Sequence, residues 1–254
     1  MSGRNSFNTI EVVKKYSGED HLQAPERTFL EKYGKDLAGM NMLDLGVGGG
    51  RTTHHFAPLV NSYQGIDNAE NMITACKNRF RNSGENIRFC VGDVRHMPEL
   101  ENDSFDLILF SFNGLDYINH EDRLKALREI RRVGKENGLF LFSSHNLNYL
   151  KRLYGVQWNK GFKEFLFQLY RAVFVRIYNG LAYKYKDQAF ATIYDGYQAF
   201  KTSTYYIRPS EQLKQLSKAG FREIQIFSVK TGKELSASNA EMLDEAWLYY
   251  LCHM

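Results

Sequence analysis

Between residues 41 and 144, short apolar runs alternate with amphipathic stretches along the chain. Each apolar run has the length of a buried strand, whereas the stretches between them repeat apolar residues at helical spacing. In the stretch 121–133, for example, Leu124, Leu127 and Ile130 recur at this spacing. The pattern predicts strands at 42–45, 63–66, 87–91, 105–111 and 139–143, and helices at 51–60, 69–80 and 121–133.

Strands that alternate with helices in this way predict right-handed crossovers and a sheet whose strands run mostly parallel. Farther along, Pro209 is placed to begin a helix over 211–219, which Gly220 would end. Two last strands are expected at 222–229 and 247–252. The expected fold class is therefore α/β, with a doubly wound, seven-stranded, mostly parallel sheet that carries helices on both faces.

The segment 146–208 differs from the sequence on either side of it. It holds 17 of the 36 aromatic residues, and its ten basic residues outnumber three acidic ones. We expect an aromatic-rich, largely helical cap insertion after the fifth strand, which could close over a substrate. The alternative is that its aromatics form a core on the sheet and its cations a solvated face. The sequence thus predicts a helical lid segment at 1–40, a core at 41–145, a substrate cap at 146–208 and a completing C-terminal helix and strands at 209–254.

Composition and charge weigh against several classes of protein. The chain carries 33 Lys and Arg against 29 Asp and Glu, an excess too small to indicate a nucleic-acid-binding protein. No apolar run reaches about 18 residues, so no membrane span is expected, and the polar start of the chain lacks a secretory signal. The three cysteines lack the spacing of a zinc site or a disulfide framework. We therefore expect a cytoplasmic protein without a bound metal.

A glycine-rich turn, Asp-Leu-Gly-Val-Gly-Gly-Gly at 44–50, follows the first predicted strand. Glycines between a strand and a helix let the backbone turn tightly and approach a ligand. Asp67 ends the second strand 21 residues after Gly46, the distance at which an acid can reach a ribose hydroxyl pair. Arg51 stands where the dinucleotide fingerprint requires glycine, which weighs against a NAD-dependent dehydrogenase.

Several motifs in order resemble those of the class I S-adenosylmethionine-dependent methyltransferases. The turn at 44–50 resembles their first motif, D/E-x-G-x-G-x-G, and Ile-Asp-Asn-Ala-Glu-Asn-Met at 66–72 is similar to the second. Gly-Asp-Val at 92–94 resembles the third motif, and the strands at 107–113 and 132–144 match the later ones.

The resemblance covers about residues 40–145, with weaker agreement at 209–229, and it departs at 135–138, where we expect a changed turn. It implies S-adenosylmethionine as cofactor, a sulfonium cation without phosphates that needs no cationic cradle. Asp44 would then suit the ammonium group of the cofactor or orient the loop amides. Tyr16 would contact its carboxylate from an N-terminal segment that such proteins often fold over the cofactor.

The resemblance also implies roles for residues within the motifs. Gly46 and Gly48 would face the methionine part of the cofactor, and Asp67 would bind the ribose. Asp93 and Val94 would contact the adenine. The full set of residues expected to bind the cofactor is Tyr16, Asp44, Gly46, Gly48, Asp67, Asn68, Met72, Asp93, Val94 and Phe110.

Catalytic candidates follow the fourth and fifth strands, because ligands bind at the carboxyl ends of strands in open α/β sheets. Methyl transfer is an in-line displacement, so positioning can supply much of the acceleration. A general base is needed only if the acceptor arrives protonated. His145 is the strongest candidate for that base, because an imidazole changes charge near neutral pH, although a structural role is the alternative. Asn113 and Tyr117 are the other candidates.

The leading hypothesis is an enzyme that methylates an O or N atom of a small-molecule acceptor. Cations of the segment 146–208 would form a rim that favours acidic or phosphorylated acceptors. One alternative is an RNA methyltransferase that uses this basic aromatic segment, but no RNA-binding module accompanies it, so nucleic acid is not the expected partner. Another alternative is a non-catalytic module that binds the cofactor. The sequence leaves open whether the chain forms a homodimer.

Overall fold

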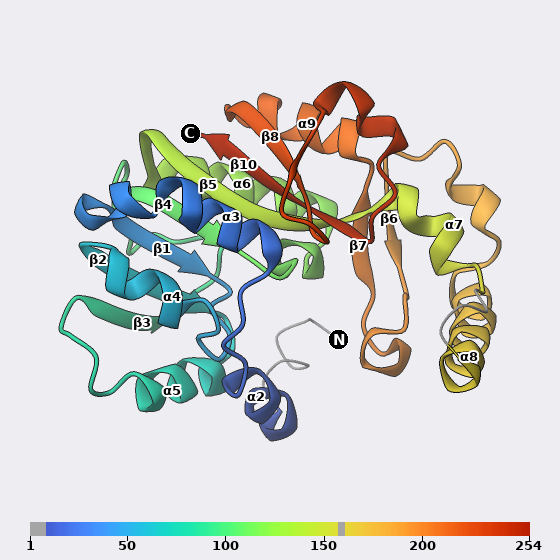
Figure 1. Cartoon of the computed structure of the whole chain (residues 1–254), viewed down its shortest axis with the longest axis horizontal. Helices are drawn as coiled ribbons and strands as arrows, with labels where there is room; N and C mark the ends of the chain where they lie inside the picture. Colours follow the sequence, from blue (N-terminus) through green and yellow to red (C-terminus); the bar gives the residue numbers. More distant parts are fainter. Residues whose placement is uncertain (1–8, 157–160) are drawn as a thin grey trace.

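The computed structural model describes residues 9–156 and 161–254, in which one large mixed sheet runs through the molecule (Figure 1). The strands on one side of the sheet pair in parallel, and the C-terminal strand pairs antiparallel with both of its neighbours. The main path across the sheet is β3 (Ile87–Val91), β2 (Ser62–Asp67), β1 (Asn41–Leu45), β4 (Phe105–Phe110), β5 (Gly134–Asn146), β10 (Trp247–His253), β8 (Arg222–Ser228) and β9 (Glu234–Leu235).

The prediction of a seven-stranded sheet is wrong. The sheet of the described residues contains ten strands, and it combines five parallel with four antiparallel pairs. The seven expected strands are present, but β9 and the hairpin of β6 (Phe190–Ile193) and β7 (Thr204–Ile207) extend the sheet. Strand β7 pairs with the last two residues of β5, His145 and Asn146. The extra strands have two to four residues each, which is too short for an alternating pattern to reveal.

Strand β5 begins earlier than predicted, because a bulge lengthens it. Along β4, the partner residue changes from Gly134 opposite Phe105 to Leu139 opposite Leu107. Asn137, within this interval, has a φ of 66°, in the left-handed region that asparagine tolerates better than most residues. The departure at 135–138 is therefore a bulge within the strand and not a changed turn before it.

Helices cover both faces of the sheet, as the sequence predicts. Successive strand residues point to opposite faces, and β4 shows this clearly: Leu107 and Leu109 join one core cluster, whereas Ile108 and Phe110 join the other. The face of Ile108 is covered by α6 (His120–Val133) and α9 (Pro209–Lys218), and the face of Leu107 by α3 (Ala24–Tyr33), α4 (Thr53–Phe56) and α5 (Glu70–Arg79).

Helix α4 is shorter than the predicted helix at 51–60. It is followed by a 3-10 turn, η2 (Ala57–Leu59), which contains Pro58. Proline has no N–H to donate to the preceding turn, so the α-helix ends before it. The other predicted helices agree with α5, α6 and α9 to within two residues at each end.

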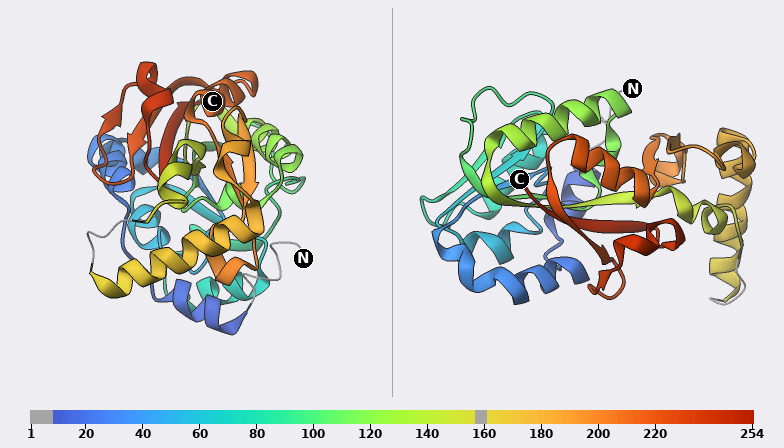
Figure 2. Two further views of the ribbon diagram at one scale, coloured as in Figure 1. Left: turned by 90° about the vertical axis from the view of Figure 1, so that its right-hand side faces the viewer. Right: turned by 90° about the horizontal axis from the view of Figure 1, so that it is seen from above.

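The aromatic segment 146–208 builds a small core of its own at one edge of the molecule (Figure 2). The hairpin of β6 and β7 belongs to this segment, so the expected helical cap is in part an extension of the sheet. Its role as a substrate cap remains a prediction. No helix among the described residues is long and apolar enough to cross a membrane. The helices of the segment are η4 (Leu147–Tyr149), α7 (Leu150–Leu153), α8 (Phe162–Asn179), η5 (Ala182–Tyr185) and η6 (Tyr197–Phe200).

The N-terminal helix α2 (Ile10–Ser17) packs beside α5 and against the glycine turn (Figure 1). A Cβ on Gly49 would lie 2.5 Å from both the Ser17 nitrogen and the Tyr16 carbonyl carbon. Only glycine therefore lets the backbone of α2 rest directly on the turn. This contact brings Tyr16 to the carboxyl edge of the sheet.

A buried ion pair joins α6 to the same edge of the sheet. Arg123 and Asp116 have no side-chain exposure, and Nη1 of Arg123 lies 2.6 Å from Oδ1 of Asp116. Arg123 also donates to Ser144 Oγ at 3.0 Å and to Gln212 Oε1 at 2.5 Å. Asp116 accepts from Ser144 Oγ at 2.8 Å and from the backbone N–H of His145 at 2.6 Å. These hydrogen bonds offset part of the cost of burying both charges.

Arg123→Met should lower the free energy of unfolding by about 3–5 kcal/mol, because it leaves the Asp116 carboxylate buried without its cation. Urea unfolding followed by circular dichroism measures this change. Arg128→Met is the matched control, because Arg128 is exposed on the same helix, and its effect should stay within about 0.5 kcal/mol. Equal stability of the two variants would contradict a structural role for the buried pair.

Candidate functional site

A cavity of about 730 Å³ opens at the carboxyl ends of β1, β2 and β4, a size typical of small-molecule sites. All ten residues predicted to bind the cofactor line it, although they come from separate elements. Of the three catalytic candidates, Tyr117 lines the cavity, whereas Asn113 and His145 do not. The ten are Tyr16, Asp44, Gly46, Gly48, Asp67, Asn68, Met72, Asp93, Val94 and Phe110.

The glycine turn reaches the cavity with its backbone in a conformation that excludes other residues. Gly46 and Gly48 have φ values of 62° and 55°, in the left-handed region. At Gly46, a Cβ would also lie 2.8 Å from the ring of Phe110. At Gly48, a Cβ would meet only the carbonyl oxygen of Gly46 within 4 Å, so a side chain there would enter the open side of the turn. The turn is therefore suited to close approach by a ligand.

Asp67 fixes the glycine turn to the end of β2. Its Oδ2 accepts from the Gly48 N–H at 2.9 Å, and its Oδ1 accepts from the Ala69 N–H at 2.8 Å. Burial raises the pKa of Asp67, although the backbone hydrogen bonds act in the opposite direction. This carboxylate thus organises the turn and also presents acceptor atoms to the cavity.

Asp44, at the end of β1, is buried and hydrogen-bonded on one carboxylate oxygen. Its Oδ2 accepts from Thr52 Oγ1 at 2.6 Å and from the Tyr63 hydroxyl at 2.5 Å. Burial raises the pKa of Asp44 to about 6, and the hydrogen bonds from Thr52 and Tyr63 oppose this rise. A cation next to Asp44 would favour its ionised form.

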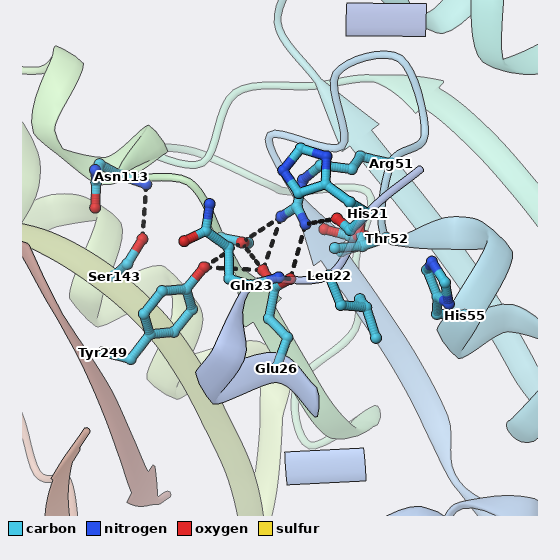
Figure 3. A network of polar contacts seen from close by, with 12 residues as sticks. His21, Leu22, Gln23, Glu26, Arg51, Thr52, His55, Asn113, Ser143 and Tyr249 are labelled. Carbon is cyan, nitrogen blue, oxygen red and sulfur yellow. Dashed lines mark hydrogen bonds and ion pairs between the residues drawn. The ribbon is translucent and has the colours of Figure 1, made fainter. Parts of the chain in front are cut away.

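Arg51 lines the cavity beside Asp44 and forms a buried ion pair with Glu26 of α3 (Figure 3). Two parallel hydrogen bonds of 2.7 Å join the guanidinium to the carboxylate. Arg51 also donates to Ser111 Oγ at 2.7 Å, and the Tyr249 hydroxyl donates to Glu26 at 2.9 Å. Burial opposes the ionisation of Glu26, but the hydrogen bonds and charge of Arg51 outweigh it and keep the pKa of this carboxyl below its ordinary value.

Sequence reasoning missed Arg51 as a site residue and used it only as evidence against a dinucleotide site. Its guanidinium carbon also lies 5.1 Å from the ring centroid of Phe112, another residue of the cavity wall. The signal that could have identified Arg51 is its position directly after a glycine turn, where a ligand without phosphates is expected. Its partner, Glu26, lies 25 residues earlier, so no local motif connects them.

Aromatic side chains close the cavity on the side of the N-terminal helix. Tyr16 and Phe112 meet edge to face with ring centroids 6.5 Å apart. The Tyr16 hydroxyl lies 3.1 Å from that of Tyr197 in η6, and the Tyr197 ring lies 5.4 Å from that of Tyr117. Phe112 and the next residue, Asn113, have φ values of 56° and 61°. Strained backbone of this kind is concentrated at functional sites.

Asp93 pairs with a neighbouring arginine at the rim of the cavity. Its two carboxylate oxygens accept from Arg95 at 2.5–3.0 Å, and Arg95 also contacts Asp122 at 2.9 Å. The hydrogen bond from Arg95 lowers the pKa of Asp93. A carboxylate oxygen has two lone pairs, so an adenine amino group can share Asp93 with Arg95.

Comparison with known proteins agrees with this geometry. Residues 42–138 match the profile of a family described as a methyltransferase domain. An uncharacterized methyltransferase, YcgJ, of Bacillus subtilis (strain 168) is 31% identical over 141 residues, which cover 51% of this chain and 53% of that relative. The chain thus spans about half the length of this curated relative.

Residues 42–138 are therefore similar to a methyltransferase domain. Two solved structures show the same fold. An S-adenosylmethionine-dependent methyltransferase from Clostridium acetobutylicum ATCC 824 superposes with a TM-score of 0.61 at 17% identity, over 95% of this chain and 92% of that one. Phosphoethanolamine N-methyltransferase 2 of Haemonchus contortus, solved with phosphomonomethylethanolamine and S-adenosylhomocysteine, has a TM-score of 0.62 at 15% identity, over 100% of this chain and 60% of that one.

S-adenosylmethionine, the cofactor that the resemblance implies, fits the chemistry of the cavity. Its ammonium and sulfonium groups are cations, and Asp44 and Asp67 bring carboxylates to the cavity. The cavity wall also contains the guanidinium of Arg51, which is paired with Glu26. Two arginines, Arg51 and Arg95, line the cavity. The individual contacts of the ten lining residues with the cofactor remain predictions.

His145 lies behind the cavity wall. Its Nδ1 contacts Asp116 Oδ2 at 2.8 Å, its Nε2 lies 3.4 Å from Asn113 Nδ2, and its ring packs beside Tyr206. No residue of 146–156 or 161–208 lines the cavity either, so the described residues do not provide the expected cationic rim. That segment instead reaches the cavity wall through Tyr197, which contacts Tyr16 and Tyr117.

Asp44→Asn removes a carboxyl with a pKa raised to about 6 and keeps an oxygen that can accept from Thr52 and Tyr63. Between pH about 4 and 6, the Asp44 carboxyl binds a proton more tightly in the folded protein than in the unfolded chain. The wild-type carboxyl therefore stabilises the fold at low pH, and this contribution is lost as the pH rises through about 6. Urea unfolding measures the free energy of unfolding of Asp44→Asn relative to that of the wild type. This difference should rise by about 2 kcal/mol when the pH is raised from about 4.5 to about 7.5. A stability difference that does not change with pH would refute the raised pKa.

Proposed function

We propose that this chain transfers the methyl group of S-adenosylmethionine to an O or N atom of a small-molecule acceptor. The observation that carries the proposal is that two kinds of surface share one cavity. The glycine turn with Asp44 and Asp67 suits the cofactor, whereas Tyr16, Phe112 and Tyr117 offer an aromatic surface for an acceptor. Both reactants could therefore be held side by side and away from water.

Positioning is the proposed source of catalysis. In-line methyl transfer requires the acceptor atom, the methyl carbon and the sulfur to be collinear, and a rigid site supplies that alignment. Burial raises the pKa of the Tyr117 hydroxyl well above its ordinary value. Tyr117 therefore stays protonated at neutral pH and can orient an acceptor by a hydrogen bond, but it does not act as a base. His145 remains the candidate base, although it does not line the cavity, so it would need to reach the acceptor through the residues that do.

The geometry favours a small acceptor over RNA. The basic residues of 146–208 lie away from the cavity in the described part of the chain, so phosphate contacts there would not direct a nucleotide base into it. Turnover to S-adenosylhomocysteine with a small acceptor would exclude the second alternative, a module that binds the cofactor without catalysis. Screening the purified protein against metabolite pools with isotopically labelled cofactor would identify that acceptor.

Asp67→Ala should weaken S-adenosylmethionine binding at least about tenfold, because it removes the proposed ribose acceptor and releases the Gly48 N–H. Isothermal titration calorimetry measures the affinity, and circular dichroism checks that the fold is intact. Glu85→Ala, at an exposed acid outside the cavity, is the control and should bind as the wild type does. Unchanged affinity in Asp67→Ala would remove Asp67 from the cofactor site.

Tyr117→Phe and His145→Ala separate the two catalytic candidates. Tyr117→Phe should slow methyl transfer about 10–100-fold without changing cofactor affinity, because it removes only one hydroxyl from the cavity wall. If His145 is the base, His145→Ala should slow the chemical step more than it alters cofactor affinity. Single-turnover rates measure both effects. A normal rate in His145→Ala would leave that residue with a structural role.

A further inference from the structure

Helix α8 exposes apolar side chains on one face and buries polar ones on another. Its buried positions include Gln168 and Asn179, at 7% and 4% exposure, whereas Phe162 and Ile177 are 64% and 68% exposed. Surface helices of globular proteins usually show the opposite arrangement. Contacts within the described chain therefore do not account for this sequence, and the exposed face is a candidate docking surface.

Five of the exposed apolar residues form one continuous stripe. They are spaced four, three, four and four residues apart, which keeps them on one side of an α-helix. The stripe runs from Phe162 to Ile177 within this 18-residue helix, a length of about 23 Å. It continues past the end of the helix with Leu181 and Tyr183, at 59% and 76% exposure. The residues of this apolar stripe within α8 are Phe162, Leu166, Leu169, Val173 and Ile177.

Basic residues lie close to the apolar stripe along the sequence. Residues 161–186 contain five Lys and Arg and a single acid, a local net charge of 5 − 1 = +4. Lys163, Lys184 and Lys186 are exposed. None of the three forms an ion pair with a carboxylate of residues 9–156 or 161–254. A surface complementary to this region would be apolar where it meets the stripe and negatively charged where it meets the lysines.

We propose that α8 rests on the surface of an anionic lipid membrane. The apolar stripe would enter the boundary of the acyl chains, and the nearby lysines would meet the lipid phosphates. A second copy of this chain fits less well, because it would bring two faces of the same charge together. The position of the helix also suits a flat partner: in the left view of Figure 2, α8 crosses the face of the molecule nearest the viewer. The inference does not depend on the proposed methyl transfer.

Sedimentation of the full-length chain with lipid vesicles tests the proposal. Vesicles of phosphatidylcholine with about 30% phosphatidylserine should bind the protein, and pure phosphatidylcholine vesicles should bind it at least about tenfold less. Raising the ionic strength should weaken binding to the anionic vesicles. Equal binding to both vesicle types, or no binding to either, would overturn the proposal.

Two variants locate the binding surface, and each has a matched control. Ile177→Glu places an acid in the apolar stripe, and Met242→Glu does the same at an apolar residue that is 73% exposed elsewhere. The double variant of Lys184→Glu and Lys186→Glu reverses the charge beside the stripe, and Lys230→Glu with Lys233→Glu reverses two exposed lysines elsewhere. The variants at the apolar stripe and at Lys184 and Lys186, here called the α8-side variants, should each lose at least about tenfold in binding to anionic vesicles. The controls should bind as the wild type does.

Light scattering and thermal melting exclude the competing explanations. All four variants should melt near the wild-type temperature, because the substituted side chains are exposed. A wild-type dimer that Ile177→Glu dissociates, without any vesicle binding, would show that a second copy covers the stripe and would overturn the membrane proposal. Loss of binding in the controls to the same degree as in the α8-side variants would also overturn it.

Discussion

The buried ion pair of Glu26 and Arg51 is the interaction on which the rest of the site depends. A carboxylate without exposure to water is stable only with a cation and further hydrogen bonds around it. Here those partners come from the turn after β1, the end of β4 and the C-terminal strand β10. Removal of either charge would leave the other unpaired in the interior. The pair therefore fixes the N-terminal segment to the carboxyl edge of the sheet (Figure 3).

The second buried pair, Asp116 with Arg123, performs the corresponding task on the opposite face. It links α6 to the end of β5 through Ser144 and the backbone of His145. The two pairs together make the edge of the sheet rigid at the points where β4 and β5 end. The left-handed residues Phe112 and Asn113 lie between them, and such strained backbone persists only where the surroundings determine it.

Local sequence signals predicted the core of this fold well. The first five strands and the glycine turn depend on neighbouring residues. All of the predicted cofactor residues except Tyr16 lie at or shortly after the ends of those strands, and one cavity collects all ten. Contacts across long sequence distances were not predictable in the same way. The pairing of β7 with the end of β5 and the partnership of Arg51 with Glu26 join residues that no short motif connects. His145 was placed correctly at a strand end, but only the structure could show that its side chain points to Asp116 and not into the cavity.

Helix α2 forms one wall of the cavity with Tyr16 and rests on the turn at Gly49 without an intervening side chain. Any ligand that contacts both the turn and Tyr16 favours the docked position of this helix, and by thermodynamic reciprocity the docked helix favours the ligand by the same factor. The affinity of the site is therefore partly set by how firmly an N-terminal helix stays in place. Substitutions on the outer surface of α2, remote from every bound atom, would then tune ligand retention.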